Sequence, residues 1–182
     1  LEGKRQVLTA DATKLIALGV LLAQKTRYMV FRSGNASGAD EYFSQGVAKI
    51  DKNRLHVIVP YSTHRTKANY ASQTYSLDDI DVSHEPAVLY ESKSNKKTDT
   101  LIDKYVAGER NQFAIKAAYI IRDTIKVLGT KDIPPATFGI FYDDLNNPNS
   151  GGTGHTMRVC THNHIPQINQ TTWFQWIDES ML

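Results

Sequence analysis

The sequence predicts an α/β protein in which a parallel sheet is covered by helices on both faces, a Rossmann-like three-layer architecture. Short apolar runs typical of strands alternate with amphipathic helical segments along most of the chain, and this alternation is typical of parallel sheets. In addition, two apolar runs, residues 28–31 and 136–142, lead through glycine-rich turns into helices. Ligands of such sheets bind beyond the carboxyl ends of the strands, which is where we expect both turns.

The composition is that of one globular domain. The chain has 182 residues, of which 41% are hydrophobic and 22% charged, so we expect a single domain over residues 1–182 with a variable excursion at about 62–108. No apolar run approaches ~18 residues, so no membrane partner is expected. Cys160 is the only cysteine, which excludes a disulfide within the chain and fits a buried thiol in a cytoplasmic protein. A net charge of +2 is too small for a basic stripe, so nucleic acid is not an expected partner.

The first third of the chain is expected to hold two helices and two strands. Residues 10–24 place leucines at helical spacing, and residues 28–31 form an apolar run typical of a buried strand. Beyond the first glycine turn, residues 40–49 continue as a helix. The β-branched run at residues 55–60 then predicts a second strand.

The alternation of strand-like and helical segments is harder to recognise between residues 66 and 100. Residues 68–75 have a weak helical pattern, residues 87–92 fit a short helix or a strand, and residues 92–100 are polar, as in a loop. A long helix is expected at 108–128, with Phe113 on its buried face and Gly129 as its C-terminal cap. The remaining expected elements are a strand at 136–142, a helix at 156–162, an edge strand at 165–169 and a terminal helix at 173–177.

The two glycine-rich turns are the strongest functional signal in the chain. Glycine lets the backbone approach a ligand closely, and the helix that follows presents unpaired N–H groups at the positive end of its dipole. A phosphate is the natural guest of such a turn, although a single turn of this kind often holds no ligand. Arg32 and Arg110 are candidates for bidentate phosphate contacts, or else for ordinary ion pairs. The residues expected to bind the ligand are Arg32, Ser33, Gly34, Asn35, Gly38, Asp40, Arg110, Ser150, Gly151, Gly152, Thr153, Gly154, His155 and Thr156.

Two carboxylates are candidate catalytic groups. Asp40 begins a helix beside the expected pocket, and Asp143 follows a strand at the same edge. A carboxylate can stabilise a cationic sugar or activate water. Each residue also has a structural explanation, because acidic residues stabilise the first turn of a helix and favour turns. No cofactor or metal is predicted, since His162 and His164 fall at an expected helix C-terminus, where histidines need no metal.

Two segments resemble the signatures of the SLOG superfamily. Residues 32–40, Arg-Ser-Gly-Asn-Ala-Ser-Gly-Ala-Asp, are similar to its first signature, and residues 151–159 followed by 165–169 are similar to its second. The superfamily includes DNA-processing protein A-like proteins, the phosphoribohydrolases called LOG, and small phage and bacterial proteins of unassigned activity, which this chain resembles most. The resemblance extends from about Gly3 to Asn169. It implies a Rossmann-like fold and a nucleotide-type ligand, such as a nucleoside monophosphate or an ADP-ribose-like molecule.

The chain departs from these signatures at two places. Asn35 stands where the first signature has a glycine. The phosphoribohydrolases carry a glutamate after their second glycine motif, whereas this chain continues with His155, Thr156, Met157 and Arg158. The glycosidase activity of those enzymes therefore does not carry over.

Three functions from different classes remain as hypotheses. The first, which we expect, is a protein that binds a nucleotide or nucleotide derivative as a sensor or to sequester it. The second is a nucleotide N-glycosidase, a hydrolase or transferase that uses Asp40 or Asp143. The third is a single-stranded DNA-binding recombination mediator, which the modest net charge disfavours. The apolar face of the helix at 108–128 would permit a homo-oligomer and is equally suited to core packing.

Overall fold

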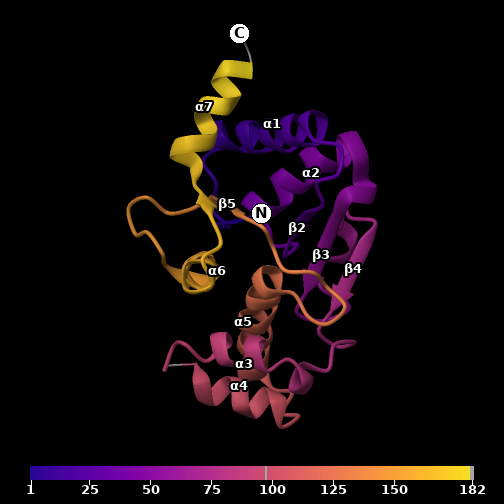
Figure 1. Ribbon diagram of the computed structural model, residues 1–182, viewed down its shortest axis with the longest axis vertical. Helices are drawn as coiled ribbons and strands as arrows, with labels where there is room; N and C mark the ends of the chain where they lie inside the picture. Colours follow the sequence, from indigo (N-terminus) through magenta and orange to yellow (C-terminus); the bar gives the residue numbers. More distant parts are fainter. Residues whose placement is uncertain (97, 181–182) are drawn as a thin grey trace.

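The computed structural model describes residues 1–96 and 98–180 and has the expected Rossmann-like α/β architecture (Figure 1). Two parallel three-stranded sheets lie at its centre. The first has the order β1-β5-β6, with β1 at Glu2–Gly3, β5 at Gly139–Tyr142 and β6 at Gln167–Ile168. The second has the order β2-β3-β4, with β2 at Phe31–Ser33, β3 at Leu55–Val59 and β4 at Gln73–Ser76.

The two sheets meet along β1 and β2. The amino nitrogen of Leu1 donates a hydrogen bond of 2.7 Å to the carbonyl oxygen of Arg32, so β1 lies beside β2. On its other side β1 pairs with β5, with Glu2 opposite Phe141. The strand order is therefore β4-β3-β2-β1-β5-β6, and it changes direction between β1 and β5. In open α/β sheets such a switch point leaves a crevice at the carboxyl ends of the strands.

Helices cover both faces of the sheets (Figure 1). On one face α1 (Thr9–Lys25) packs against α2 (Ala39–Asp51), and α7 (Gln170–Ser180) packs against α1. On the other face α5 (Gln112–Leu128) packs against α6 (Gly151–His162). The helices α3 (Pro86–Ser92) and α4 (Asp99–Val106) pack on α5 at the end of the molecule opposite α7. None of the described helices combines the length and apolar character needed to cross a membrane.

The core is divided between these layers. Leu18, Phe43 and Trp173 belong to a cluster that holds α1, α2 and α7 against the sheet. Ile102 and Ile121 belong to a second cluster, which unites α3, α4 and α5. Cys160 is 1% exposed in a third cluster, so the expectation of a buried thiol is confirmed. The helices on the two faces are thus fixed by separate apolar contacts.

Several expected elements are wrong in extent or type. The strand expected at 28–31 begins only at Phe31 and continues to Ser33. The weak helical pattern at 68–75 gives way to a short 3-10 turn, Thr66–Ala68, and to strand β4, because pairing with β3 overrides local propensity. Residues 99 and 100, the end of the polar segment expected at 92–100, are helical instead and begin α4, Asp99–Val106.

The long helix expected at 108–128 is shorter than predicted. Gly108 adopts a φ of 96°, and the side chain of Asn111 caps α5 by accepting hydrogen bonds from the N–H groups of Phe113 and Ala114. Phe113 is 58% exposed rather than buried, because it lies in the first turn before the helix enters the core. The expected C-terminal cap at Gly129 is confirmed, with a φ of 72°.

The helix expected at 156–162 begins earlier, at Gly151. The glycines of the second turn therefore form the first turn of α6 rather than a loop before it. This shift moves the amino end of the helix dipole onto the glycines themselves.

Candidate functional site

A cleft of about 940 Å³ opens at the carboxyl ends of β1, β2 and β5. Its walls are the segments that follow these strands, one side of α5 and the first turns of α6. The cleft lies at the edge where open α/β sheets bind their ligands, next to the switch point between β1 and β5. It is therefore the candidate functional site.

The second glycine turn opens directly into this cleft. Ser150 is the N-cap of α6, but its side chain makes no capping hydrogen bond. Within the described ranges, no backbone group accepts a hydrogen bond from the N–H groups of Gly151, Gly152 and Thr153. A Cβ added to Gly151 would meet no atom within 4 Å, so the space before the helix is open. Unpaired donors at the positive end of a helix dipole favour an anion.

The first glycine turn is filled by the protein itself. The Asp40 carboxylate, which is 1% exposed, accepts hydrogen bonds from the N–H groups of Gly3 and Gly34 at 3.2 and 3.0 Å. It also accepts a hydrogen bond of 3.1 Å from the Ser33 hydroxyl. The Arg122 guanidinium donates to the carbonyl oxygen of Gly34, and a Cβ on Gly34 would overlap it. Side chains of the protein thus occupy the position in which a phosphate was expected.

The amino end of α2 is also covered. Gly38, the N-cap of α2, has a φ of 85° and lies against the carbonyl group of Arg5. The N–H group of Ala39 donates to the carbonyl oxygen of Lys4 at 3.3 Å. Asn35 has a φ of 53°, a left-handed conformation that asparagine tolerates well. The first turn is therefore a structural joint between β1, β2 and α2.

Buried charged side chains form the floor of the cleft. We call Glu2, Arg122, Asp123 and Lys126 the charged floor; their side chains are at most 8% exposed. Lys126 forms ion pairs with Glu2 and with Oδ1 of Asp123, and Arg122 Nε lies 2.9 Å from the same Asp123 oxygen. Burial, followed by the charge of Asp123, raises the pKa of Glu2 to about 7. The charged floor is thus internally compensated, and three of its members, all except Lys126, line the cleft.

The outer part of the cleft is basic and partly aromatic. Lys116 and Arg5, both exposed, line it together with Arg158 and Tyr119. The Arg5 guanidinium carbon lies 5.9 Å from the centre of the Tyr119 ring. Arg158 donates a hydrogen bond of 3.0 Å to the carbonyl oxygen of Asn149 at the start of the second turn. These cations supply countercharge for an anionic ligand.

His155 faces α5 from the second turn of α6. It is 5% exposed, and its Nε2 atom lies 2.9 Å from Oγ1 of Thr124. Burial lowers the pKa of His155, so the ring is neutral at pH 7. It lines the cleft as a neutral group rather than as a cation.

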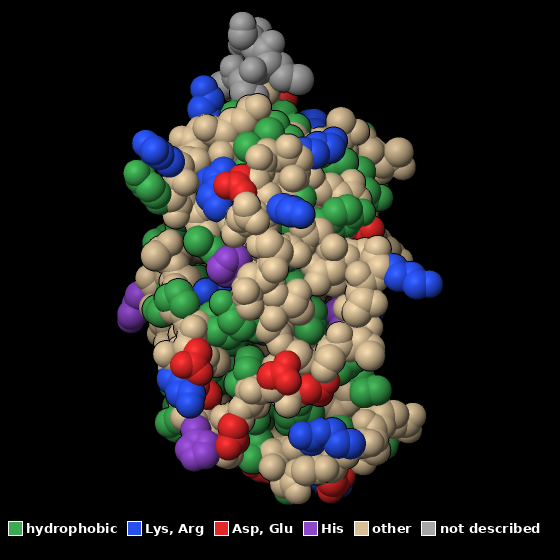
Figure 2. Space-filling model, turned by 90° about the vertical axis from the view of Figure 1, so that its right-hand side faces the viewer, with side chains coloured by type: hydrophobic (Ala, Val, Ile, Leu, Met, Phe, Trp, Pro, Cys, Tyr) green, Lys and Arg blue, Asp and Glu red, His purple; other side chains and the backbone are tan. Residues whose placement is uncertain are grey.

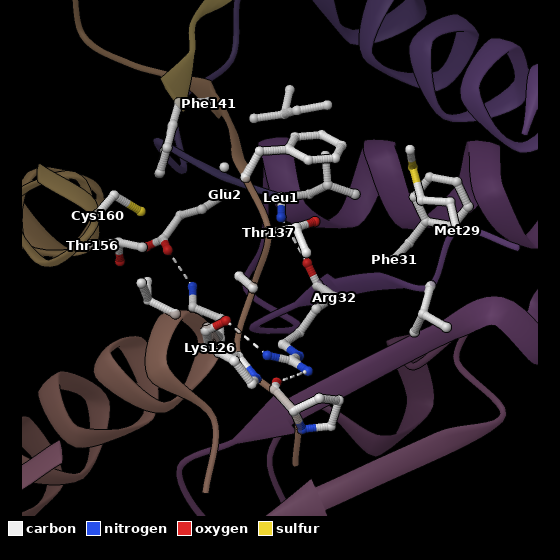
Figure 3. A pocket seen from close by; sticks show the side chains of 18 of the residues that line it. Leu1, Glu2, Met29, Phe31, Arg32, Lys126, Thr137, Phe141, Thr156 and Cys160 are labelled. Carbon is white, nitrogen blue, oxygen red and sulfur yellow. Dashed lines mark hydrogen bonds and ion pairs between the residues drawn. The ribbon is translucent and has the colours of Figure 1, made fainter. Parts of the chain in front are cut away.

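A second cavity, of about 470 Å³, lies at the amino ends of β1, β2 and β5 (Figure 3). Its lining is mainly apolar, with Met29, Phe31 and Phe141 among the side chains that face it. Its cations are engaged, because Arg32 donates to the carbonyl oxygens of Lys126 and Pro134 at 3.0 and 2.7 Å, and Lys126 pairs with Glu2. No N-terminus of a described helix lines this cavity, so it has no comparable place for an anion. We therefore place the candidate site in the larger cleft.

The structure brings only part of the predicted site together. Asp40 and residues 150–153 and 155 line the cleft, whereas Arg32 lines the opposite cavity. Arg110 lies over the ring of Tyr105, 4.2 Å from its centre, and donates to the Tyr105 carbonyl oxygen outside the cleft. Asp143 does not line the cleft either; its Oδ2 atom accepts a hydrogen bond of 3.1 Å from the Asn149 N–H group.

The remaining predicted residues are structural neighbours of the cleft. The backbone around Gly154 packs so closely on Asn149 that a Cβ there would overlap it. The Thr156 hydroxyl donates a hydrogen bond of 3.2 Å to the carbonyl oxygen of Gly152 within α6. Ser33, Gly34, Asn35 and Gly38 build the filled first turn and do not line the cleft.

Sequence reasoning missed the charged floor and Lys116. The charged floor comes from β1 and from α5, neither of which contains a glycine motif. A signal was present: Arg122, Asp123 and Lys126 interrupt a helical face that carries Ile121 and Ile125. Charged residues on an otherwise apolar helical face indicate a buried ionic cluster, since charges are seldom buried without partners.

Comparisons of the chain with protein-family models, with curated proteins and with solved structures return no match. The resemblance in the two glycine-rich segments therefore remains an expectation. The functional argument depends on the geometry of the cleft.

Proposed function

We propose that the protein binds a nucleotide or nucleotide derivative in the cleft, as a sensor or to sequester it. The open first turn of α6 is the observation that carries this proposal. Three residues whose N–H donors have no described backbone acceptor form a helix N-terminus that lines a cleft at the switch point of the sheet. A phosphate group satisfies both the donors and the dipole.

The dimensions and charge of the cleft support a ligand of nucleotide size. Its volume of about 940 Å³ is at the upper end of the range common for small-molecule sites, ~300–1,000 Å³. Lys116, Arg5 and Arg158 supply positive charge at the rim, and Tyr119 supplies a ring. A nucleoside monophosphate or an ADP-ribose-like molecule has the corresponding anionic and planar parts.

The two alternative functions receive no specific support. Asp40 is held by the backbone donors of the first turn, and Asp143 does not line the cleft, so neither candidate catalytic carboxylate stands free in the site. On the face seen in Figure 2, the described Lys and Arg side chains are spread among acidic ones and form no continuous stripe. A groove for single-stranded DNA needs such a basic track.

A ligand screen tests the proposal. Nucleoside monophosphates, ADP-ribose and NAD are added singly, thermal unfolding is recorded, and each mixture is then analysed by mass spectrometry. A ligand present at 100 times its Kd stabilises the folded state by about 2.7 kcal/mol, so we expect a clear rise in Tm with the ligand recovered intact. Cooperative melting with no shift for any nucleotide would contradict the proposal, and a released base would replace it with the hydrolase hypothesis.

A further inference from the structure

The hydrogen bonds of His155 fix which of its two ring nitrogens carries the proton. The Nε2 atom lies 2.9 Å from the Thr124 hydroxyl, which donates its own proton to the carbonyl oxygen of Ile120 at 3.0 Å. The same hydroxyl accepts a hydrogen bond of 2.9 Å from the Ser92 hydroxyl. Because the proton of Thr124 is already used, its oxygen can only accept from the ring. The Nε2 atom of the neutral imidazole therefore carries the proton, and Nδ1 keeps a lone pair.

This Nδ1 atom and a neighbouring hydroxyl open to the cleft beside the N-terminus of α6. His155 and Thr153 both line the cleft and are only 5% and 7% exposed. Among the described residues, neither Nδ1 of His155 nor the hydroxyl of Thr153 has a hydrogen-bond partner, and the protein encloses neither atom. Polar groups on side chains as buried as these are normally paired, so the two atoms point to a ligand in the cleft.

Two glycines leave open the space between the His155 ring and the start of the helix. Residues three and four positions apart lie on one face of a helix, and their side chains lean toward its N-terminus. Gly152 and Gly151 hold these positions before His155, so no side chain separates the ring from the N–H groups of the first turn. A Cβ on Gly151 would meet no atom within 4 Å. The ring and the N–H donors therefore border the same space.

From this arrangement we infer that His155 selects a phosphate group that carries a proton, so that the ligand ends in a phosphate monoester. The inference rests on the proposed function and names the chemistry of its ligand. The N–H groups of α6 and the Thr153 hydroxyl donate to phosphate oxygens, whereas Nδ1 of His155 accepts and needs an O–H group on the same phosphate. A phosphate monoester retains such a proton in part of its population near neutral pH, because its second pKa is about 6. The internal diphosphate of ADP-ribose or NAD carries none.

The surroundings of the ring favour a neutral acceptor over a cation. Burial lowers the pKa of His155, and the charged groups that act on the ring come from three helices and are of both signs: Asp123 and Lys126 of α5, Arg158 of α6 and Glu91 of α3. Lys126 is already paired with Asp123 and is not free to bind a second anion. A singly charged, protonated phosphate therefore matches the site better than a doubly charged one.

The test compares each of the four nucleoside 5′-monophosphates with two analogues by calorimetric titration of the intact chain at pH 6.5. One analogue has a sulfate ester in place of the phosphate, and the other has a methyl ester on the phosphate. Both keep one negative charge and lack the proton. We expect the monophosphate to bind at least tenfold more tightly than either analogue, which leaves Nδ1 of His155 without a donor. Equal affinities would overturn the inference and leave the proposed function standing, whereas failure of every nucleotide to bind would overturn both.

Two substitutions separate recognition of the proton from recognition of charge. His155→Gln places its amide group where Nε2 meets Thr124 and leaves no acceptor at the position of Nδ1. His155→Asn instead keeps a hydrogen-bond acceptor close to the position of Nδ1. We expect the Gln variant to lose most of the preference for the monophosphate over the sulfate ester and the Asn variant to retain most of it, with thermal unfolding used to verify that each is folded. An unchanged preference in a folded His155→Gln protein would contradict the inference, because the site would then select the phosphate by its charge alone.

Discussion

The two glycine-rich turns of this protein have similar compositions and different roles. At the first, residues 34–38, the side chains of Asp40 and Arg122 and the backbone of Lys4 and Arg5 fill the space around the glycines. At the second, residues 150–154, the N–H groups of the first helical turn face an open cleft. A glycine motif is thus a site only where the rest of the chain leaves it uncovered.

The difference follows from which elements lie opposite each turn. The first turn lies beneath α5, which places Arg122 against the carbonyl group of Gly34. The second turn also touches α5, because Asp123 Oδ2 lies 3.1 Å from the Cβ position of Gly152, but the Cβ position of Gly151 meets no atom within 4 Å. The same helix therefore closes the first turn, whereas it leaves the Gly151 side of the second turn open and forms one wall of the cleft beside it.

Alanine at the positive-φ glycine of each turn gives the largest contrast. Gly38→Ala introduces strain at a φ of 85° and forces a Cβ into the Arg5 carbonyl group, so we expect a loss of about 4 kcal/mol in the free energy of unfolding. Gly151 also has a positive φ, 61°, but the Cβ that Gly151→Ala adds would meet no atom within 4 Å. We therefore expect a loss of only about 1 kcal/mol in the free energy of unfolding. Urea unfolding of both variants measures the difference. Equal losses would show that the first turn is not closed as described.

Asp40→Asn tests the structural joint directly. Asparagine keeps one acceptor oxygen, but its NH₂ group cannot accept, so either Gly3 or the pair Ser33 and Gly34 loses its hydrogen-bond acceptor. We expect the free energy of unfolding to fall by about 3 kcal/mol, since buried donors lose their partners. Asp144→Asn is the matched control, because Asp144 is a more exposed acid whose ion pair with Lys4 spans 3.5 Å. A stable Asp40→Asn protein with altered ligand turnover would favour the catalytic hypothesis instead.

The pH dependence of stability gives a smaller test of the region beside the first turn. Burial, and then the charge of Arg122, lower the pKa of His64 from 6.5 to about 4. The unfolded chain therefore binds a proton more readily than the folded one between pH 6.5 and 4, so stability falls as the pH is lowered through this window. We expect His64 to account for a loss of about 2 kcal/mol between pH 7 and 4.5.

His64→Phe isolates this contribution. The His64 ring packs edge-on between Tyr61 and Tyr119, at centroid distances of 5.3 and 5.6 Å, and phenylalanine preserves an aromatic ring there. Urea titrations at the two pH values compare the variant with the natural sequence. If both proteins lose the same stability on acidification, His64 is not held neutral by the fold.

The smallest expected effect concerns the second turn. Ser150→Asp places a carboxylate at the N-cap of α6, where the natural side chain makes no capping bond, and Ser150→Asn is its uncharged counterpart. Both variants are expected to fold with unchanged or slightly raised Tm, because Asp and Asn are favoured N-caps. The added charge repels a phosphate, so we expect Ser150→Asp to bind the nucleotide about tenfold more weakly than Ser150→Asn, or about 1.4 kcal/mol. Equal affinities would place the phosphate elsewhere.

The sequence predicts the architecture well, because alternating apolar runs and amphipathic helices depend on local periodicity. Prediction from the sequence fails where pairing between distant strands determines the structure, as at β4, where residues with a weak helical pattern pair with β3. It also fails at Gly108 and Asn111, whose backbone geometry and capping separate α4 from α5. These are long-range or capping effects that periodicity does not report.

The candidate site was only half predictable. The glycines of the second turn are recognisable from composition, and they line the cleft. The position of Arg32 was not, because its guanidinium donates to the carbonyl oxygens of Lys126 and Pro134 in the lining of the other cavity, and these contacts depend on the tertiary fold. Glu2 and Asp123 are 121 residues apart in the numbering and meet only through the packing of α5 and α6 around β1.

The most direct test of the difference between the turns is an NMR titration of the ¹⁵N-labelled protein with a nucleoside 5′-monophosphate. We predict that the amide resonances of Gly151, Gly152 and Thr153 shift with a common affinity, while those of Gly34 and Gly38 remain in place. Saturable shifts at Gly34 and Gly38, with the amides of α6 unmoved, would contradict the account and transfer the ligand site to the first turn.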